Sequence, residues 1–365
     1  MMIKENTVAI SFVGDIFPAN LSYNRNCGVA SLNFGENCRK EYVRMIQDII
    51  PSDNIVVGNL ESPILPSEKF SKEHQFAGHL DFVKMLKEAG IYVVSLANNH
   101  ILEWRTEGLR STESALNEHG IDYIGTIDRN GETKVLTIEK NGLRLAFLSY
   151  NDIDNDKYER GVVCEYNKEQ VIKDIRGVKT HNVDAIFLIL HWGDEYIHRP
   201  SREQIEAAHA FIDAGAKFVI CSHPHVVQPV EEYHGGLICY SLGNFIFDMA
   251  IPKAARIGMV VNLEISKDSF THKERFVRIQ ENFFPQKMND DRIIRKILES
   301  QKELMKDCQT LGYSELYQKE KKNKRRNKRI LEKILLFKNW SKYTPAIRQD
   351  FINRYKRKLF GHGYN

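Results

Sequence analysis

Residues 185–196 read AIFLILHWGDEY, and residues 217–225 read KFVICSHPH. Each stretch opens with apolar residues that do not alternate with polar ones, which is typical of a strand buried on both faces. His191 follows the first apolar run, and Ser222 followed by His223-Pro224-His225 comes after the second. Three other apolar runs end in a similar way, at residues 8–13 before Gly14-Asp15, at 54–57 before Gly58–Glu61 and at 92–96 before Asn98–His100. Because ligands bind beyond the carboxyl ends of strands in open α/β sheets, we expect these five segments to meet in one site.

The segments between these strands have the spacing of amphipathic helices. This spacing predicts helices over residues 41–50, 80–89, 108–119, 168–179 and 203–214, the last one ending at Gly215. Further apolar runs predict strands over residues 143–149, 237–242 and 259–265, and Asn141-Gly142 predicts a hairpin turn between residues 134–139 and 143–149. Strands that alternate with helices, with an added hairpin, indicate an α/β protein with a mixed sheet.

Composition excludes several other classes of protein. The chain has 365 residues, of which 42% are hydrophobic and 27% charged, so it is expected to be globular. No run of about 18 apolar residues could span a membrane as a helix. The N-terminal sequence MMIKENTVAISFVGD has no small-residue cleavage site, and we interpret it as a strand rather than a signal peptide, which favours a cytoplasmic protein. The six cysteines form no CxxC pair and are expected to be reduced.

Charge is distributed unevenly along the chain. Residues 285–365 carry 22 Lys and Arg against 9 Asp and Glu, whereas the rest of the chain carries 30 against 39. We therefore expect an acidic domain over residues 1–284 and a basic, helical C-terminal extension over residues 285–365. Within the extension, amphipathic spacing predicts helices over residues 291–306, 330–340 and 345–359.

The residues at the strand ends are typical of a metal site. Asp, Glu, Asn and His without thiolates favour Mn²⁺, Fe²⁺ or Zn²⁺. The set is large enough for two divalent metal ions that share a bridging carboxylate, an arrangement that activates water and binds the oxygens of a phosphate ester. His100 lies beside Asn99, a candidate ligand, and histidine titrates near neutral pH. We therefore predict that His100 is the general acid for the leaving group.

Each motif taken alone also has a structural explanation. Gly14-Asp15 is a common junction between a strand and a turn, Asn98-Asn99 is typical of turns, and His191 could be a packed core histidine. His223-Pro224-His225 is more specific, because two imidazoles one residue apart on an extended segment point the same way and the proline stiffens the loop. The joint placement of the motifs at strand ends favours a site.

In this order, the motifs resemble those of the bacterial capsule-synthesis CapA family, also called the poly-γ-glutamate synthesis protein family. The matching segments are FVGDIF, VVGNLESPI, VSLANNHILEW, LILHWGDEY, ICSHPHVVQPVE and CYSLGNFIFD, over roughly residues 8–250. The family is similar to the calcineurin-type metallophosphoesterases. The resemblance therefore implies a four-layer α/β/β/α sandwich, metallophosphoesterase-like, with a dinuclear site at one end of its sheets.

The resemblance also implies roles for individual residues. It assigns Asp15, Glu61 and His225 to the first metal ion, Glu61, Asn99, His191 and His223 to the second, and His100 to the acid. Two positions depart from the wider phosphoesterase pattern: Phe17 stands where those enzymes carry a metal-binding histidine, and Gly-Asn-Leu-Glu replaces their aspartate-based second motif. Whether Asn59 or Glu61 bridges the metals is open at this stage. Asn244 matches a family motif without an evident chemical role.

Two functions from different classes fit these observations. The first is a metal-dependent hydrolase that acts on a phosphate ester, or on an amide, in the synthesis or remodelling of a capsular or cell-surface polymer. Its substrate would be phosphorylated or related to an anionic polymer. The second is a non-catalytic assembly component that binds the polymer or its synthase. The chain keeps His100 and every candidate ligand except the histidine that Phe17 replaces, and this favours the enzyme.

The basic extension suggests a further partner. Residues 319–329 hold eight basic side chains and one acidic one, and apolar residues at helical spacing follow: Ile330, Leu331, Ile334, Leu335, Phe337 and Trp340. This composition is typical of a segment that lies on an anionic membrane surface. The apolar face could instead pack on the domain, and the basic run could be a solvated helical face. Nucleic-acid binding is not expected, because the domain has no recognition module.

Overall fold

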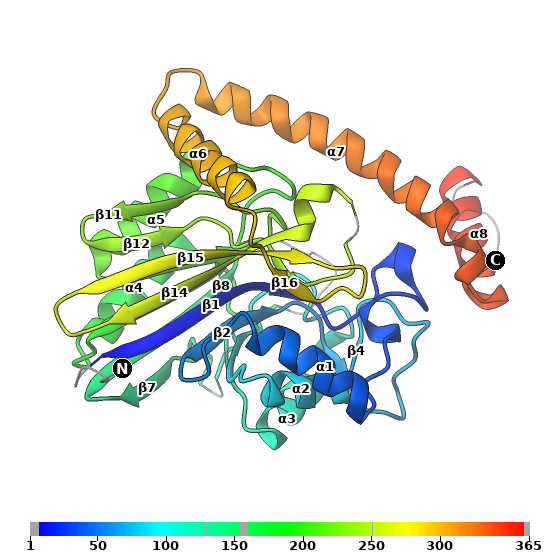
Figure 1. Ribbon diagram of the computed structural model, residues 1–365, viewed down its shortest axis with the longest axis horizontal. Helices are drawn as coiled ribbons and strands as arrows, with labels where there is room; N and C mark the ends of the chain where they lie inside the picture. Colours follow the sequence, from blue (N-terminus) through cyan, green and yellow to red (C-terminus); the bar gives the residue numbers. More distant parts are fainter. Residues whose placement is uncertain (1–6, 129, 154–159, 250, 361–365) are drawn as a thin grey trace.

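The computed structural model describes residues 7–128, 130–153, 160–249 and 251–360. Two β-sheets lie face to face, helices cover the outer side of each sheet, and a separate group of helices follows at the C-terminal end (Figure 1). The predicted four-layer α/β/β/α sandwich with a helical C-terminal extension is therefore confirmed. The first six residues of the predicted domain and the last five of the extension lie outside the described residues.

The first sheet combines a parallel part with an antiparallel edge. Its order is β16-β15-β14-β1-β2-β5-β6, and β13 also pairs with β1. Strands β1, β2, β5 and β6 run parallel, whereas β14, β15 and β16 are antiparallel to their neighbours. The bounds are Val8–Ile16 (β1), Ile55–Leu60 (β2), Val93–Ser95 (β5), Asp122–Ile124 (β6), Asn244–Ile246 (β13), Ile257–Ile265 (β14), Phe270–Ile279 (β15) and Pro285–Lys287 (β16).

The second sheet has the order β11-β12-β10-β9-β8-β7. Its four central strands are parallel, and the predicted hairpin of β7 and β8 forms one edge. The bounds are Leu136–Lys140 (β7), Leu143–Asn151 (β8), Ala185–His191 (β9), Phe218–Ser222 (β10), Val230–Tyr233 (β11) and Gly236–Cys239 (β12). A short separate pair is formed by β3 (Ile64–Leu65) and β4 (Gly78–His79).

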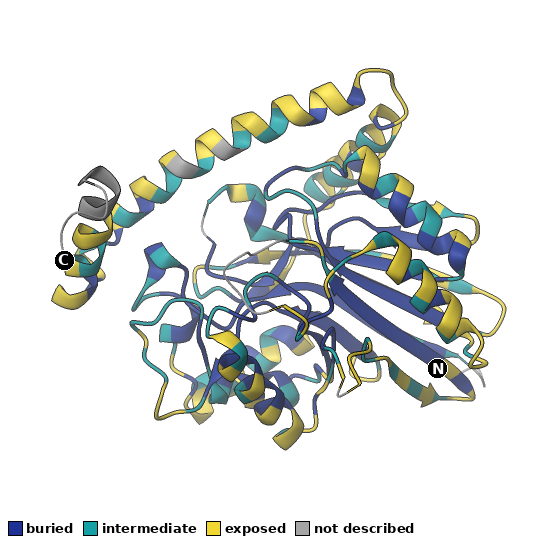
Figure 2. Ribbon diagram, turned by 180° about the vertical axis from the view of Figure 1, so that it is seen from behind, coloured by how far each residue is buried: buried dark blue, intermediate teal, exposed yellow. Residues whose placement is uncertain are grey.

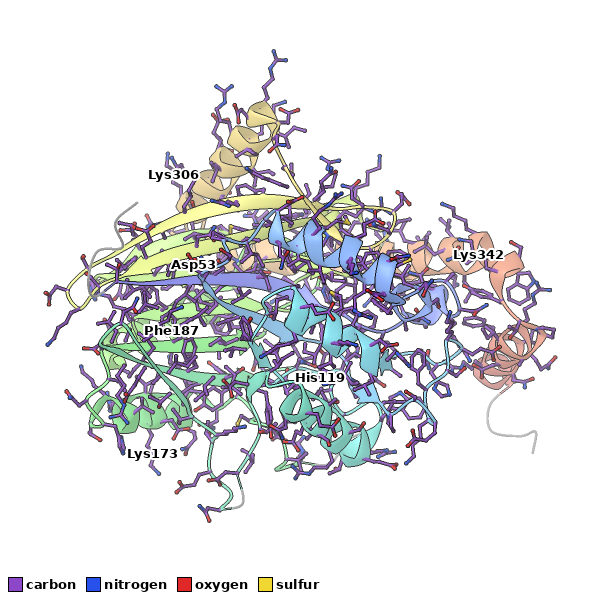
Figure 3. All side chains as sticks on the ribbon, turned by 60° about the horizontal axis from the view of Figure 1, so that its bottom comes forward. Asp53, His119, Lys173, Phe187, Lys306 and Lys342 are labelled. Carbon is purple, nitrogen blue, oxygen red and sulfur yellow. The ribbon has the colours of Figure 1, made fainter. Side chains whose placement is uncertain are left out.

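Phe187 on β9 shows how the two sheets pack together. Its ring centroid lies 5.5 Å from that of Phe12 on β1 and 4.7 Å from that of Phe147 on β8. Figure 3 shows Phe187 between the strands of the two sheets. The adjacent residues Ile186 and Leu188 belong to the opposite face and to the core under the covering helices. Because both faces of β9 are buried, the strand is apolar until its last residue.

Five helices cover the two sheets. Helices α1 (Glu36–Gln47), α2 (Leu80–Glu88) and α3 (Arg105–Glu118) pack on the first sheet, and α4 (Lys168–Lys179) and α5 (Arg202–Ala214) pack on the second. Ser201 begins α5 with a capping box, in which its side chain and that of Gln204 each accept a hydrogen bond from the other's backbone N–H. Gly215 ends α5 with a φ of 124°, as the sequence predicts.

Strand β15 was not predicted from the sequence. Exposed residues such as Thr271 and Lys273 alternate with partly buried ones at its start, so no continuous apolar run marks it. Strand β16 pairs with β15. The first sheet therefore continues to Lys287, a residue within the range that the charge distribution predicts for the extension.

The extension consists of α6 (Asp291–Asp307), α7 (Tyr313–Lys338) and α8 (Pro345–Phe360). The basic run and the apolar segment after it form one helix of 26 residues, α7, and not two separate elements. Apolar residues of α6 pack against the core between the sheets. Figure 2 shows the sheets buried and much of α7 exposed. In the part of the chain that the structure describes, no helix is both long and apolar enough to span a membrane.

Candidate metal centre

All six predicted metal ligands lie at the same edge of the sandwich. Three come from the first sheet, at the end of β1, directly after β2 and in the loop after β5. Three come from the second sheet, at the last residue of β9 and directly after β10. Five of the side chains are buried and that of Asn99 is partly buried. The six residues are Asp15, Glu61, Asn99, His191, His223 and His225.

Asp15, Glu61 and His225 form the first ligand set. Their candidate ligand atoms all lie within 4.8 Å of one another. His225 Nδ1 is 3.4 Å from Asp15 Oδ2, and His225 Nε2 is 3.9 Å from Glu61 Oε1. The grouping is the one that the family resemblance implies for the first metal ion.

The second ligand set consists of Glu61, Asn99, His191 and His223. The candidate ligand atoms of Glu61 and the two histidines lie within 4.8 Å of one another. His191 Nε2 lies 2.8 Å from Asn99 Oδ1, 3.1 Å from His223 Nδ1 and 3.6 Å from Glu61 Oε1. Three potential ligand atoms therefore converge around this ring nitrogen, again in the grouping that the resemblance implies.

Glu61 belongs to both sets, and its surroundings fit a metal ion. Both of its carboxylate oxygens are buried and have no hydrogen-bond partner among the described residues. Burial raises the pKa of Glu61 well above its usual range, and the charges of Asp15 and Glu195 add to this effect. A buried carboxylate without a partner is costly to ionise. A divalent cation would supply the missing partner, so the residues fit the implied metal ions.

The two histidines of the second set are suited to bind a metal ion. Burial lowers the pKa of His191 well below its usual range, and the neighbouring His223 acts in the same direction. Burial, with the nearby His225, lowers the pKa of His223 to about 4. Neutral imidazole is the form that coordinates metal ions. At neutral pH both rings are therefore already in the binding form.

Asn59 supports the ligands through hydrogen bonds. Its Nδ2 donates to Asp15 Oδ1 at 2.8 Å and lies 3.2 Å from His191 Nδ1. Its Oδ1 accepts a hydrogen bond from Asn98 Nδ2 at 3.1 Å. Because both ends of the amide are engaged, the geometry favours Glu61 over Asn59 as the shared ligand. Asn59 instead fixes a carboxylate and an imidazole from the two facing sheets.

Two more residues orient the histidine rings. Asn244 Oδ1 lies 2.9 Å from His225 Nδ1, and its Nδ2 donates to the carbonyl oxygen of Ala255. Ser222 Oγ lies 3.0 Å from His191 Nδ1. Hydrogen bonds of this kind fix the ring orientation and the protonated nitrogen of metal-binding histidines. No pattern in the sequence marks Ser222 as a site residue or indicates a role for Asn244.

The backbone around these residues is unusual. His223 and His225 have φ values of 98° and 57°, in the left-handed region that residues other than glycine rarely adopt. Such conformations persist where the surrounding structure enforces them, frequently at functional sites. Nearby, a Cβ atom on Gly14 would lie 2.0 Å from the carbonyl oxygen of Gly243. This close approach allows β13 to pair with β1 and places Asn244 opposite Asp15.

His100 is held by two contacts. Its ring stacks on Phe76 with a centroid distance of 4.5 Å, and its Nδ1 lies 3.0 Å from Glu103 Oε1. A proton shared between Nδ1 and the carboxylate leaves Nε2 as the nitrogen that can exchange a proton with a ligand. The side chain is 18% exposed. The strand-end pattern of the sequence marks His100 but neither Phe76 nor Glu103.

Phe17 gives the first ligand set an apolar border. The ring is buried and stacks on Phe247 at 4.5 Å, and Phe247 lies 4.9 Å from the ring of His225. The departure from the wider phosphoesterase pattern is therefore accommodated by aromatic packing. Position 17 supplies no metal-binding side chain here.

A cavity of about 740 Å³ adjoins the second ligand set. Asn99 and His223 line it, whereas the other four ligands do not. The rest of the lining comes from the residues after β8, from Tyr166 before α4, from the HWGDEY segment, from the start of α5 and, without a signal in the sequence, from α7. The charged and aromatic lining residues are Asp152, Tyr166, Trp192, Asp194, Glu195, Tyr196, Glu203, Tyr317, Lys321 and Lys328.

The fold and the candidate site together define a class of protein. It is an α/β/β/α sandwich with a buried group of carboxylates and histidines that is suited to bind divalent metal ions. Comparison with known proteins agrees with the sequence motifs: the family described as bacterial capsule synthesis protein PGA_cap matches residues 9–249. The chain belongs to this family.

Individual relatives are consistent with that membership. The chain is 34% identical to the capsule biosynthesis protein CapA of Bacillus anthracis, over 57% of this chain and 54% of the relative. It is 30% identical to the PGA biosynthesis protein CapA of Bacillus subtilis, over 67% and 64%. The chain thus spans roughly half to two thirds of the length of these curated relatives. Among solved structures, the NAD nucleotidase NadN of Haemophilus influenzae is 13% identical with a TM-score of 0.45, over 82% of this chain and 56% of that one.

Proposed function

We propose that this protein is a metal-dependent hydrolase that cleaves a phosphate ester during the synthesis or remodelling of an anionic capsular polymer. The observation that carries the proposal is Glu61, a buried carboxylate without hydrogen-bond partners that is shared by two ligand sets. Membership of a capsule synthesis family supports the polymer as the setting of the reaction.

Asp15, Glu61 and His225 would hold one metal ion, and Glu61, Asn99, His191 and His223 the other. Such a pair of divalent ions, when bound, activates water and stabilises the charge on a phosphoryl group during displacement. Mn²⁺, Fe²⁺ and Zn²⁺ all suit this mixture of carboxylate, amide and imidazole ligands. The chain contributes the buried surroundings in which these charges act strongly.

His100 would donate the proton to the leaving oxygen. It follows Asn99 directly, and Asn99 lines the cavity in which a substrate would lie. Glu103 and Phe76 would keep the ring in place during the transfer. A correctly placed general acid accelerates such reactions by about 10²–10⁴-fold.

The experiment is hydrolysis of bis(p-nitrophenyl) phosphate by the full chain loaded with Mn²⁺, with H100N as the variant. We expect H100N to keep its metal content and to lose about 10²–10⁴-fold in turnover, because it removes a proton donor and no ligand. The matched control is H181N, which changes an exposed histidine just after α4 that belongs to none of the motifs.

Two outcomes would contradict the proposal. Wild-type turnover in H100N would remove this histidine from the reaction. A wild-type protein that binds two ions but cleaves neither this ester nor an oligo-γ-glutamate amide would favour the alternative function, a non-catalytic component that binds the polymer or its synthase.

A further inference from the structure

Helix α7 lies outside the residues that match the family, yet it forms one wall of the cavity. Two ion pairs hold it to the segment after β9. Lys321 Nζ lies 2.7 Å from Asp194 Oδ2, which also accepts a hydrogen bond from the hydroxyl of Tyr317 at 2.9 Å. Lys328 pairs with Glu195. The extension is thus connected directly to the HWGDEY segment of the site.

Both lysines keep donors that a ligand can use. An ammonium group carries three N–H donors. Lys321 pairs with Asp194, and Lys328 pairs with Glu195 and lies 3.9 Å from Glu332 Oε1, so these carboxylates do not occupy all the donors. Although burial acts in the opposite direction, the charge of Lys328 lowers the pKa of Glu195 to about 2, so this carboxylate is ionised at neutral pH. Both lysines line the same cavity as Asn99 and His223. The carboxylates therefore fix two cationic groups beside the second ligand set.

We propose that Lys321 and Lys328 are substrate-binding residues that contact anionic groups of the substrate whose scissile bond lies at the metal centre. The two lysines are seven residues apart, which is about 10 Å along a helix. They could therefore contact two successive anionic groups of an extended chain. The proposal rests on the proposed function, because it states how the polymer substrate of that reaction is held.

The experiment is calorimetric titration of the Mn²⁺-loaded protein with a tetra-γ-glutamate oligomer and, separately, with tripolyphosphate. We expect K321M/K328M to bind the oligomer about ten- to a hundredfold more weakly, since each charged hydrogen bond contributes strongly. The matched control K322M/K338M removes two exposed lysines from the same helix and should bind as the wild type does. Metal content reports whether each variant is folded.

The single variants K321M and K328M each retain one ion pair to the HWGDEY segment and serve if the double variant does not fold. Equal affinity of K321M/K328M and K322M/K338M for both ligands would overturn the proposal. A preference for tripolyphosphate that K321M/K328M abolishes would support it with phosphate as the anionic group. Oligomer binding without any ester hydrolysis would overturn the proposed function and leave the lysines as an anion-binding site.

The outer face of α7 carries a second inference from a different observation. The apolar residues predicted to form one face are divided between two environments. Leu335 is buried against the domain, whereas Ile330, Ile334 and Phe337 are 53%, 53% and 75% exposed. These three recur at spacings of four and three residues and so share one side of the helix. Exposed large apolar residues that lie together indicate an interaction surface.

Basic residues accompany this apolar stripe. Lys319, Arg326 and Lys333 are exposed and recur every seven residues, which keeps them on nearly the same side of the helix as Ile330 and Phe337. A helix that presents apolar and basic side chains together is suited to the interface of a membrane with anionic lipids. Each basic side chain near such a surface adds to the attraction.

We infer that this face of α7 binds an anionic phospholipid surface. Because the opposite face of α7 lines the cavity, binding would hold the site beside the membrane. The experiment is cosedimentation of the full chain with phosphatidylcholine vesicles that contain about a quarter phosphatidylglycerol, at low and high salt. We expect binding at low salt, weaker binding at high salt and none to pure phosphatidylcholine.

The variant I334S/F337S should bind these vesicles at least about tenfold more weakly, because two apolar side chains no longer enter the interface. The matched control L311S/V135S removes two exposed apolar side chains elsewhere and should bind as the wild type does. Wild-type protein that ignores anionic vesicles at low salt would overturn the inference. A wild-type protein that is a dimer in solution, together with a monomeric I334S/F337S variant, would also overturn the inference. That result would assign the apolar stripe to contact with a second copy of the chain.

Discussion

The two ligand sets share Glu61 but differ in composition and access. The second set adds two imidazoles and an amide to Glu61, and two of its members line the cavity. The first set adds only Asp15 and His225, lines no part of that cavity and is bordered by the aromatic pair Phe17 and Phe247. The same fold therefore presents two candidate metal sites side by side, one with more potential ligands than the other.

This difference indicates a division of work between the two sets. Affinity rises with the number of protein ligands, so we expect the second set to bind its ion more tightly than the first. The second set also contacts the space in which a substrate would lie. The first set shares Glu61 with the second, and its ion would mainly supply the second positive charge of the metal pair.

The largest expected effect comes from E61Q, which changes the residue common to both sets. We expect loss of both metal ions, measured as metal content by mass spectrometry after reconstitution with Mn²⁺. The matched control is E68Q, at an exposed carboxylate. Two ions retained by E61Q would show that the sets do not depend on a shared carboxylate.

E61Q should also raise the stability of the metal-free protein by an amount that depends on pH. Burial raises the pKa of Glu61 in the folded, metal-free protein above its pKa of about 4.3 in the unfolded chain. The stability that protonated Glu61 contributes is therefore complete below the unfolded-state pKa and is lost as pH rises through the folded-state pKa. Metal-free E61Q should therefore unfold at a higher temperature than metal-free wild type at pH 7, with the advantage vanishing near pH 4. Thermal scans in chelator measure this, and a lower unfolding temperature for E61Q at pH 7 would contradict the account.

The next largest effect separates the two sets. H191A should lose the ion of the second set and keep a weakly bound one, because His191 Nε2 is the atom on which that set converges. H225A should lose the ion of the first set and keep the tightly bound one. Titration with Mn²⁺ followed by equilibrium dialysis measures both. Identical residual affinities in the two variants would remove the difference between the sets.

The smallest effects concern the residues that orient the rings. N244A removes the partner of His225, and S222A removes a partner of His191. Changes of this kind weaken metal binding by about 10–100-fold. We expect N244A to act on the weaker ion and S222A on the tighter one, each measured by the same dialysis. Q349A, at a residue on the distant helix α8, is the control.

The sequence predicted that these side chains meet at one edge of the sheets, because five apolar runs each stop at polar residues. In a strand buried on both faces, that change of character marks the end of the sheet and hence the site edge. The shared ligand was not predictable, because the choice between Asn59 and Glu61 depends on hydrogen bonds from Asn59 to residues of two different sheets.

Other features depend on long-range contacts that carry no local pattern. Glu103 is charged and lies on a turn, and only the fold places it beside His100. Strand β15 has a polar outer face and so lacks an apolar run. The sequence of α7 indicates only a basic helix. Its position on the cavity follows from ion pairs of Lys321 and Lys328 to Asp194 and Glu195, more than a hundred residues earlier in the chain.

The most direct test of the account is anomalous diffraction from crystals of the full chain soaked in Mn²⁺ at rising concentration. The account predicts two peaks, one among Asp15, Glu61 and His225 and one among Glu61, Asn99, His191 and His223, with the second peak filling at the lower concentration. A single peak, peaks away from Glu61, or earlier filling of the first ligand set would contradict it.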